Sequence, residues 1–239
     1  GWTLAAAEEI TKDDGRRTTP SMRGGTADDG GKTTDDALHL PSEDVLDLLA
    51  HLVDKSLVAM DDSSEDESGA ETRYRFLETI RQFARDKLLD SGESERIRTA
   101  HMHYFDALAR EAEPALRSAA ASSWQSRLYA DQDNFRSAIE WAVAHDPETA
   151  LRIAGNLMFF WAERGRMTEG RAWLRQSLAQ VDALPAADGK AAREREALRA
   201  RGFGAVAHLC VMLGESRAGR TAAPRPPGSE TLPPTRRAA

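Results

Sequence analysis

Residues 24–34, with the sequence GGTADDGGKTT, come closest in this chain to a motif with chemistry of its own. They contain Gly-Lys-Thr, the end of a phosphate-binding P-loop, in which backbone amides and the lysine hold nucleotide phosphates. The spacing does not fit, because Thr26 stands five positions before Gly31, where the motif requires glycine. Asp28 and Asp29 would also bring negative charge to the phosphates, and no apolar strand precedes the stretch. We therefore predict a loop without a nucleotide site.

Two pairs of residues have the chemistry of metal ligands without the spacing. His101 and His103 lie two residues apart in a helical pattern, as do Asp131 and Asp133. Residues that share a helix face are three or four apart, so neither pair is placed to hold one ion. We expect His101 to pack against its neighbours and His103 to be solvated or to cap a helix. The sequence predicts no catalytic, cofactor-binding or metal-binding residue in this chain, and thus no enzyme.

Basic residues in the middle of the chain are the stronger functional candidates: Arg73, Arg75, Arg81, Arg85 and Lys87. A winged helix that reads DNA places the helix before the wing in the major groove, and the wing touches phosphates. Here that helix would expose only acids and one histidine, and the wing (residues 61–71) carries six acidic residues. Because these would repel phosphates, we expect no direct DNA binding. The arginines are expected to pair with nearby acids or to dock another domain, unless they are simply a solvated helix surface.

Length and composition predict a partly structured, cytoplasmic protein. The 239 residues suffice for one or two domains, and the 41% hydrophobic share is slightly low. The shortfall lies in residues 11–38, 61–71 and 222–239, which are predicted to be two loops and a disordered tail. A single cysteine, Cys210, excludes an intrachain disulfide and fits a reducing compartment. No apolar run approaches the ~18 residues that span a membrane, and no signal peptide is evident.

The first half of the chain has the element order of a winged helix. Thr3 can cap a first helix over residues 1–10, and Ser42 can cap a second helix that ends at Lys55. The second helix should bury the stripe Val45, Leu48, Leu49, Leu52 and Val53. A strand is predicted at 57–60 and another at 72–76, where Tyr74 and Phe76 alternate with arginines. From residue 78 a helix follows, with an apolar stripe of Leu77, Ile80, Phe83, Ala84 and Leu88.

The second half is predicted to be an antiparallel α-solenoid of five helices, over residues 94–116, 122–145, 151–163, 168–181 and 191–213. One unit fits the tetratricopeptide repeat, whose period is about 34 residues, if Gly165 is the glycine between its two helices. Its packing positions are then Leu157, Trp161, Met167, Gly170, Leu174, Ser177 and Leu178. The first helix of such a pair faces the concave side, which makes Arg152, Phe159 and Glu163 candidates for a partner groove.

A second unit would turn at Leu213 and Gly214, but a Pro-rich tail replaces its partner helix. We interpret this as a truncation, a shifted reading frame or a chain end that leaves apolar surface bare. Residue 1 is glycine and not methionine, which fits a processed or partial chain. The predicted division is a winged-helix-like regulatory domain at 1–91 with a disordered insertion at 11–40, a tetratricopeptide-like helical domain at 92–214, and a disordered tail at 215–239.

Six segments in this order resemble the middle of bacterial STAND-type ATPase regulators, including LuxR-like transcriptional regulators: GWTLAAAEEI, DVLDLLAHLVDKSLV, RYRFLETIRQFARDKL, HMHYFDALAREAEPAL, DQDNFRSAIEWAVAH and GRMTEGRAWLRQSLA. The resemblance implies that an NTPase domain using ATP and magnesium precedes this segment and that a DNA-binding output domain lies at either end. It also implies that the winged helix is an internal regulatory joint, with Tyr74, Phe76, Ile80 and Arg81 coupling it to the helical repeats. The P-loop expected upstream is absent, so no ATP-binding residue is carried over.

These observations lead to one main hypothesis and two alternatives. The main one is a noncatalytic sensor segment whose helical repeats bind a protein or small inducer and signal to the absent NTPase domain. One alternative is a free-standing tetratricopeptide-like adaptor that binds proteins. The other is a winged-helix protein that binds DNA directly, for which steeply salt-dependent affinity would be diagnostic.

Overall fold

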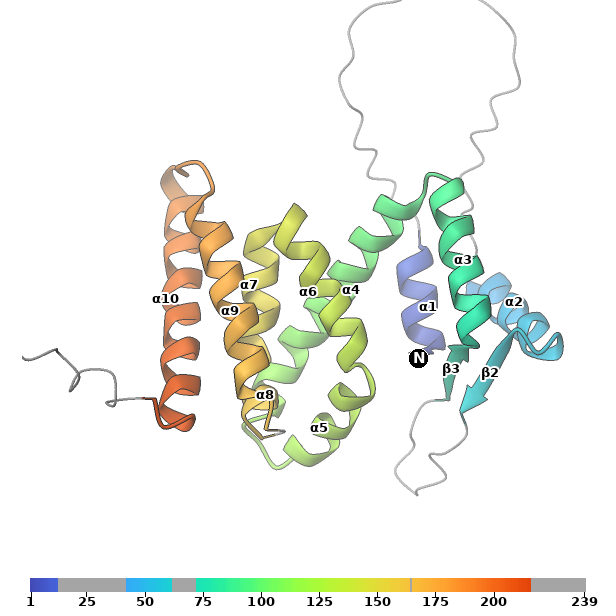
Figure 1. The fold of residues 1–239 in the computed structure, drawn as a ribbon, viewed down its shortest axis with the longest axis horizontal. Helices are drawn as coiled ribbons and strands as arrows, with labels where there is room; N and C mark the ends of the chain where they lie inside the picture. Colours follow the sequence, from blue (N-terminus) through green and yellow to red (C-terminus); the bar gives the residue numbers. More distant parts are fainter. Residues whose placement is uncertain (13–41, 62–71, 164, 216–239) are drawn as a thin grey trace, which may run out of the picture.

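A computed structural model describes residues 1–12, 42–61, 72–163 and 165–215 of the chain. Within these ranges the fold is mainly helical, with ten helices and three short strands. Figure 1 shows two parts: a small sheet with helices α1 to α3, and a row of helices α4 to α10. The predicted fold class, a small winged-helix-like part followed by a helical solenoid, is confirmed.

The N-terminal unit, as we call the first part, contains β1 (Trp2–Thr3), α1 (Leu4–Thr11), α2 (Ser42–Asp54), β2 (Val58–Asp61), β3 (Arg73–Phe76) and α3 (Glu78–Asp90). Its three strands are antiparallel in the order β1-β3-β2, and Trp2 lies opposite Tyr74. Thr3 caps α1 as predicted, since its hydroxyl accepts from the amide of Ala6 at 3.2 Å. The two residues before the helix form β1, whose backbone pairs with β3.

The core of the N-terminal unit is small. Four apolar side chains are buried together, Val45, Leu49, Val58 and Tyr74, and Trp2 and Phe76 pack beside them with ring centroids 4.7 Å apart. The predicted burial of Leu48 is wrong: 45% of this residue is exposed. Val45 and Leu49 are four residues apart and therefore share the inner face of α2, whereas Leu48 falls on its outer side.

Helix α3 forms as the periodicity predicts, but the residues that the structure describes cover its apolar stripe only in part. None of its residues is buried, and Ile80, Ala84 and Leu88 are only partly shielded. Phe83 is 60% exposed. The periodicity identified the helix correctly, while the burial of its stripe is not found among the described residues.

The helical array, as we call the second part, consists of α4 (Ser94–Ala115), α5 (Ala121–Ala130), α6 (Gln132–His145), α7 (Pro147–Asn156), α8 (Met158–Glu163), α9 (Met167–Asp182) and α10 (Gly189–Met212). Two predicted helices are each divided in two. The helix expected over 122–145 breaks at Asp131, and the helix expected over 151–163 breaks at Leu157 and begins earlier, at Pro147. Asp146 caps α7, because its carboxylate accepts from the amide of Thr149 at 3.1 Å.

Both breaks serve long-range contacts. At Asp131 the side chain is engaged by residues from β3 and α6. At Leu157 the change of direction places Leu157, Phe160 and Trp161 in the core of the array with no exposed surface. The helix count of the array is therefore seven in the described residues, against the five predicted.

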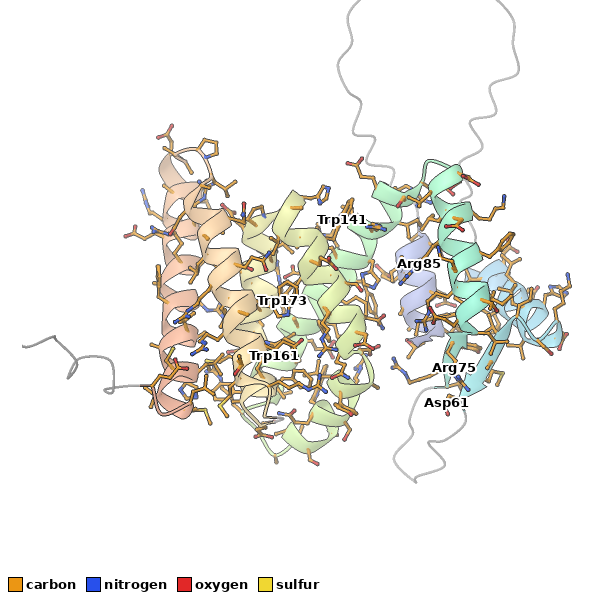
Figure 2. The ribbon with its side chains drawn as sticks, viewed as in Figure 1. Asp61, Arg75, Arg85, Trp141, Trp161 and Trp173 are labelled. Carbon is orange, nitrogen blue, oxygen red and sulfur yellow. The ribbon has the colours of Figure 1, made fainter. Side chains whose placement is uncertain are left out.

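The predicted packing positions of the repeat lie in the core of the array. Leu157, Trp161, Leu174 and Ser177 have no exposed surface, Leu178 is buried, and Met167 packs against the cluster from a half-buried position. Gly165 forms the turn between α8 and α9 with φ of 66°. Figure 2 shows Trp161 and Trp173 between the helices of the array. Neighbouring helices pack in chain order, α6 on α7, α7 on α9 and α9 on α10.

Several predictions concern residues outside the described ranges. The P-loop-like stretch at 24–34 and almost all of the insertion at 11–40 belong to residues 13–41, and most of the acidic wing belongs to residues 62–71. The predicted disordered tail lies at 216–239, apart from Glu215. None of the described helices is both long enough and apolar enough to cross a membrane.

Gly170 provides a direct test of the packing in the array. A Cβ atom built on Gly170 would lie 2.5 Å from Cγ of Trp161, so Gly170→Ala must push α9 away from a buried ring. We expect it to lower the free energy of unfolding by roughly 1–3 kcal/mol, which is typical of overpacking. The higher helix propensity of alanine would offset only part of this loss. Urea unfolding with an unchanged m-value measures this.

Gly204→Ala in α10 is the matched control for Gly170→Ala. A Cβ atom there would meet nothing within 4 Å, so we expect a gain of about 0.5–1 kcal/mol from helix propensity alone. Equal stabilisation by the two substitutions would contradict the close packing of Gly170 against Trp161.

Candidate functional site

The two parts of the molecule are joined by what we call the Arg73 junction: Arg73, Asp131, Asn134 and the carbonyl of Gly1. Arg73 lies on β3, and its guanidinium donates to the carboxylate of Asp131 at 2.5 and 3.3 Å. The same guanidinium donates to the carbonyl oxygens of Gly1 and Ala130, both at 3.1 Å. One arginine of the third strand therefore binds the residue before the first strand and the break between α5 and α6.

Asp131 is buried, with 7% of its surface exposed. Besides Arg73 it accepts from Asn134, whose side-chain amide donates to Oδ1 at 2.9 Å and to the carbonyl of Gly1 at 2.8 Å. A buried carboxylate is tolerated only when a cation and further donors satisfy its oxygens. The junction meets this requirement with residues from both parts of the molecule. Beside it, α1 packs along α4 (Figure 1).

His101 lies on α4 within the electrostatic influence of the junction. Its ring packs on Phe105 with centroids 4.6 Å apart, which agrees with the packing role that the sequence predicts. Burial lowers the pKa of His101 to about 4, and the nearby charge of Asp131 opposes this only in part. The imidazole is therefore neutral at pH 7. The carboxylate of Asp131 near it is already paired with the guanidinium of Arg73.

The four residues predicted to couple the domains lie on the side of the N-terminal unit. Tyr74 is buried in its core, and Phe76 packs on Trp2. Ile80 is half-buried on α3, and Arg81 pairs with Glu78 of the same helix at 3.0 Å. The polar contact to the array comes instead from Arg73, the residue before Tyr74.

The other basic candidates do not gather at the junction. Lys87 pairs with Asp90 on α3 at 3.6 Å. Arg75 and Arg85 are exposed (Figure 2) and make no ion pair with a residue that the structure describes. The expectation that arginines pair with nearby acids thus holds for Arg73 and Arg81.

In the sequence, Asp131 stands out only as one half of a possible metal-ligand pair with Asp133. The structure separates the two carboxylates, since Asp133 pairs with Arg136 at 2.6 Å. One signal could have revealed the break: Asp is a favoured residue at the start of a helix, and it stands inside a predicted helix of 24 residues, over 122–145. No pattern in the sequence indicates that Arg73 is its partner.

The three groove candidates are placed differently. Arg152 is held by Asp106, with distances of 2.8 and 3.0 Å, and by the hydroxyl of Thr149 at 2.7 Å. Phe159 packs between the guanidinium of Arg117 and the ring of His208, 5.0 and 5.9 Å from its centroid. Glu163 is exposed and does not line the pocket described next. Of the three, only Arg152 lines that pocket, while Phe159 contacts two of its lining residues, Arg117 and His208, from beside it.

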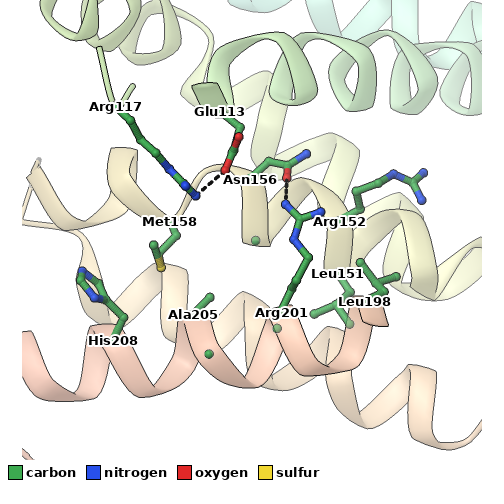
Figure 3. A pocket seen from close by; sticks show the side chains of 13 residues that line it. Glu113, Arg117, Leu151, Arg152, Asn156, Met158, Leu198, Arg201, Ala205 and His208 are labelled. Carbon is green, nitrogen blue, oxygen red and sulfur yellow. Dashed lines mark hydrogen bonds and ion pairs between the residues drawn. The ribbon is translucent and has the colours of Figure 1, made fainter. Parts of the chain in front are cut away.

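The pocket has a volume of about 270 Å³ and lies between the end of α4, the break between α7 and α8, and the inner face of α10 (Figure 3). Its lining combines charged and polar groups with an apolar floor, from Glu113, Arg117, Leu151, Arg152, Gly155, Asn156, Met158, Leu198, Arg201, Gly202, Gly204, Ala205 and His208. The pocket and the junction lie in the same helical array, and α7 packs against α4 and α6.

The described residues do not fit a nucleotide or a metal cluster. In P-loop and dinucleotide-binding folds, the nucleotide phosphates bind where a glycine-rich turn leads from a strand into a helix. The direct strand-to-helix connection here, from β3 through Leu77 to α3, has no glycine and places Glu78 in the first turn. No group of three or more His, Cys, Asp or Glu side chains in the described part is arranged to hold a metal ion. No step through ATP or magnesium is therefore derived for this chain.

The low pKa of His101 predicts how stability depends on pH. The pKa is about 4 in the folded protein against 6.5 ordinarily, so the unfolded chain binds the proton first as the pH falls. Stability from this residue is complete above pH ~6.5 and is lost towards pH ~4, up to about 3 kcal/mol, at about 1.4 kcal/mol per pKa unit. Urea unfolding at several pH values measures the slope.

His101→Gln should make this slope shallower between pH 7 and pH 4, whereas His103→Gln, two residues away on the same helix and exposed, should leave it unchanged. A loss of packing in His101→Gln would lower the free energy of unfolding by the same amount at every pH, so it would not change the slope against pH. Identical slopes for both variants would contradict the burial of His101 as a neutral side chain.

No protein-family model matches this chain, and no solved structure matches it significantly. Three curated mycobacterial proteins are 38% identical to it over 138 residues. One is from Mycobacterium bovis and two are from strains of Mycobacterium tuberculosis, and each bears the name "putative HTH-type transcriptional regulator". The match covers 56% of this chain but only 14% of each relative. More than half of the chain is thus similar to a small part of much longer transcriptional regulators.

Proposed function

We propose that this chain is a noncatalytic regulatory segment of a cytoplasmic STAND-type, LuxR-like transcriptional regulator. Its helical array binds a small inducer or a protein, and the N-terminal unit passes the change on to an NTPase domain and an output domain elsewhere in a longer protein. The observation that carries the proposal is the Arg73 junction, because it ties the sheet to the backbone and side chains of the array through one partly buried ion pair.

The dependence of the small unit on the array supports this role. The N-terminal unit buries only four apolar side chains as a cluster of their own in the described residues, and the array has a separate and much larger core. A unit with so small a core has little stability by itself. Contacts with the array, at the junction and between α1 and α4, therefore contribute a large share of its order. A ligand that changes the array also changes the N-terminal unit.

Thermodynamics sets the condition for signalling. A ligand shifts an equilibrium between two arrangements only by the difference between its affinities for them. In this proposal the two arrangements are the junction formed and the junction broken. The division into a winged-helix-like unit at 1–91 and a tetratricopeptide-like array at 92–214 belongs to the same proposal. It is supported by the two separate cores and by the turn between α3, which ends at Asp90, and α4, which begins at Ser94.

The surface of α2 supports an output domain outside this chain. In a DNA-reading winged helix, the helix before the wing faces base edges and phosphates. The exposed polar residues of α2 include Asp44, Asp47, His51 and Asp54, and the whole chain has a net charge of -7. The name of the mycobacterial relatives places a helix-turn-helix in those proteins, of which this chain spans 14%. DNA reading by another part of the longer protein agrees with both observations.

The first test compares hydrogen exchange in the unaltered chain and in Arg73→Met. We expect amide protection to fall together in β1, β3 and the α5–α6 region, by roughly 30-fold, because a hydrogen-bonded charge contributes about 1.5–3 kcal/mol. Arg85→Met is the control, since Arg85 is exposed and has no ion pair with a described residue. Protection lost in β3 alone, with α5 and α6 unaffected, would show that the two parts are not coupled.

The second test separates the proposal from DNA binding and from catalysis. A labelled DNA duplex is titrated with the chain at low and at high salt, and ATP hydrolysis is assayed on the same preparation. We expect no binding with a steep salt dependence, because the helix that would read the groove is acidic, and no turnover of ATP. Either a steep salt slope or sustained ATP hydrolysis by this chain alone would overturn the proposed role.

A further inference from the structure

We infer that the pocket between α4, α7 and α10 is a binding site for a small anion that carries a carboxylate or phosphate group. This inference deepens the proposed sensor function and rests on it only in treating the array as the ligand-binding part. Three arginines from different elements line the pocket: Arg117 after α4, Arg152 on α7 and Arg201 on α10. The guanidinium of Arg201 is turned toward Asn156, whereas that of Arg152 points away from the other labelled side chains (Figure 3) and binds Asp106.

The positive charge at the pocket is not neutralised by its neighbours. Glu113 is the one acidic residue in the lining, and it is bound by Arg117. Arg152 pairs with Asp106, which also pairs with Arg110 at 2.8 Å. Arg201 makes no ion pair with any described residue. The lining itself therefore holds three arginines and one acid, and Arg201 is the arginine among them that no described acid pairs with.

Arg201 is oriented by a neutral acceptor. Its guanidinium donates to Oδ1 of Asn156 at 3.1 Å, and Asn156 is 4% exposed at the end of α7 (Figure 3). An amide oxygen fixes the direction of a guanidinium without cancelling its charge, whereas a carboxylate would do both. The remaining donors of Arg201 are thus available to an anion, and guanidinium groups match the geometry of carboxylate and phosphate.

Two glycines keep the space open. Gly155 on α7 and Gly204 on α10 both line the pocket, and a Cβ atom at either position would meet nothing within 4 Å. Larger side chains would extend into this space or into the solvent at its mouth. The volume of about 270 Å³ lies below the range of about 300–1,000 Å³ that is typical of drug-sized ligands. The pocket therefore suits a small anion with a few carbon atoms better than an extended ligand.

The test titrates the chain with inorganic phosphate and with succinate at constant ionic strength, by calorimetry. We expect saturable binding of at least one probe at a single site, weakened about tenfold or more in Arg201→Gln, which removes a charge-assisted contact. Arg193→Gln is the matched control, because Arg193 is exposed on the same helix and lies outside the pocket. It should bind within about twofold of the unaltered chain, since distant charges are screened by salt.

Gly204→Glu is a second variant that does not depend on removing an arginine. It places a carboxylate at the pocket from a position with open space, so we expect it to fold and to abolish binding of phosphate and of succinate. Binding that is unchanged in both Arg201→Gln and Gly204→Glu, or no binding of either probe to the unaltered chain, overturns the inference. Tight binding of a short Glu-rich peptide without a response to phosphate or succinate would also overturn it, in favour of a protein partner.

The outcome is distinguishable from a failure of the proposed function. If phosphate and succinate do not bind but Arg73→Met still loosens β3 and α5–α6 together, the anion site is wrong and the coupling segment stands. If an anion binds at Arg201 but the two parts exchange independently in Arg73→Met, the site stands and the coupling is wrong.

Discussion

The burial of one carboxylate, Asp131, constrains the whole arrangement of the chain. A buried charge is costly unless a cation and further donors satisfy it, and here these come from Arg73 on β3 and from Asn134 on α6. To meet them, the helix expected over 122–145 is broken at Asp131, and β3 is held against the array. The carbonyl of Gly1 is bound by the same two side chains, which fixes β1 at the edge of the sheet.

Around this ion pair the two parts of the molecule differ in how firmly they are held. The array has a continuous core, with close contacts such as that between Gly170 and Trp161, whereas the core cluster of the N-terminal unit has four buried apolar side chains among the described residues. Helix α3 has an apolar stripe that the described residues cover only in part, and Phe203 and Val211 on α10 are more than half exposed. A weakly stabilised unit that depends on a firm one is suited to respond to binding at the firm one. This relationship supports a regulatory role more directly than any single residue does.

Much of the fold follows from local patterns in the sequence, while the candidate sites do not. The period of the apolar residues predicted α3, α4, α9 and α10, and the order of large and small residues predicted that Trp161, Gly170 and Leu174 pack together. Leu48 was expected inside because it belongs to a dense apolar run, yet only one face of α2 meets the sheet. The pairs Arg73 with Asp131 and Arg152 with Asp106 join residues 58 and 46 positions apart. No helical or strand period extends over such distances, so only the three-dimensional structure reveals these pairs.

The most direct measurement of the central claim is the interaction energy between Arg73 and Asp131 in a double-mutant cycle. The free energy of unfolding is measured by urea for the unaltered chain, Arg73→Met, Asp131→Asn and the double variant. If this ion pair holds the two parts together, the effects of the single substitutions are strongly non-additive, with a coupling of about 1.5–3 kcal/mol. Additive effects, with a coupling near zero, would show that the N-terminal unit and the helical array are independent of this contact and would contradict the account.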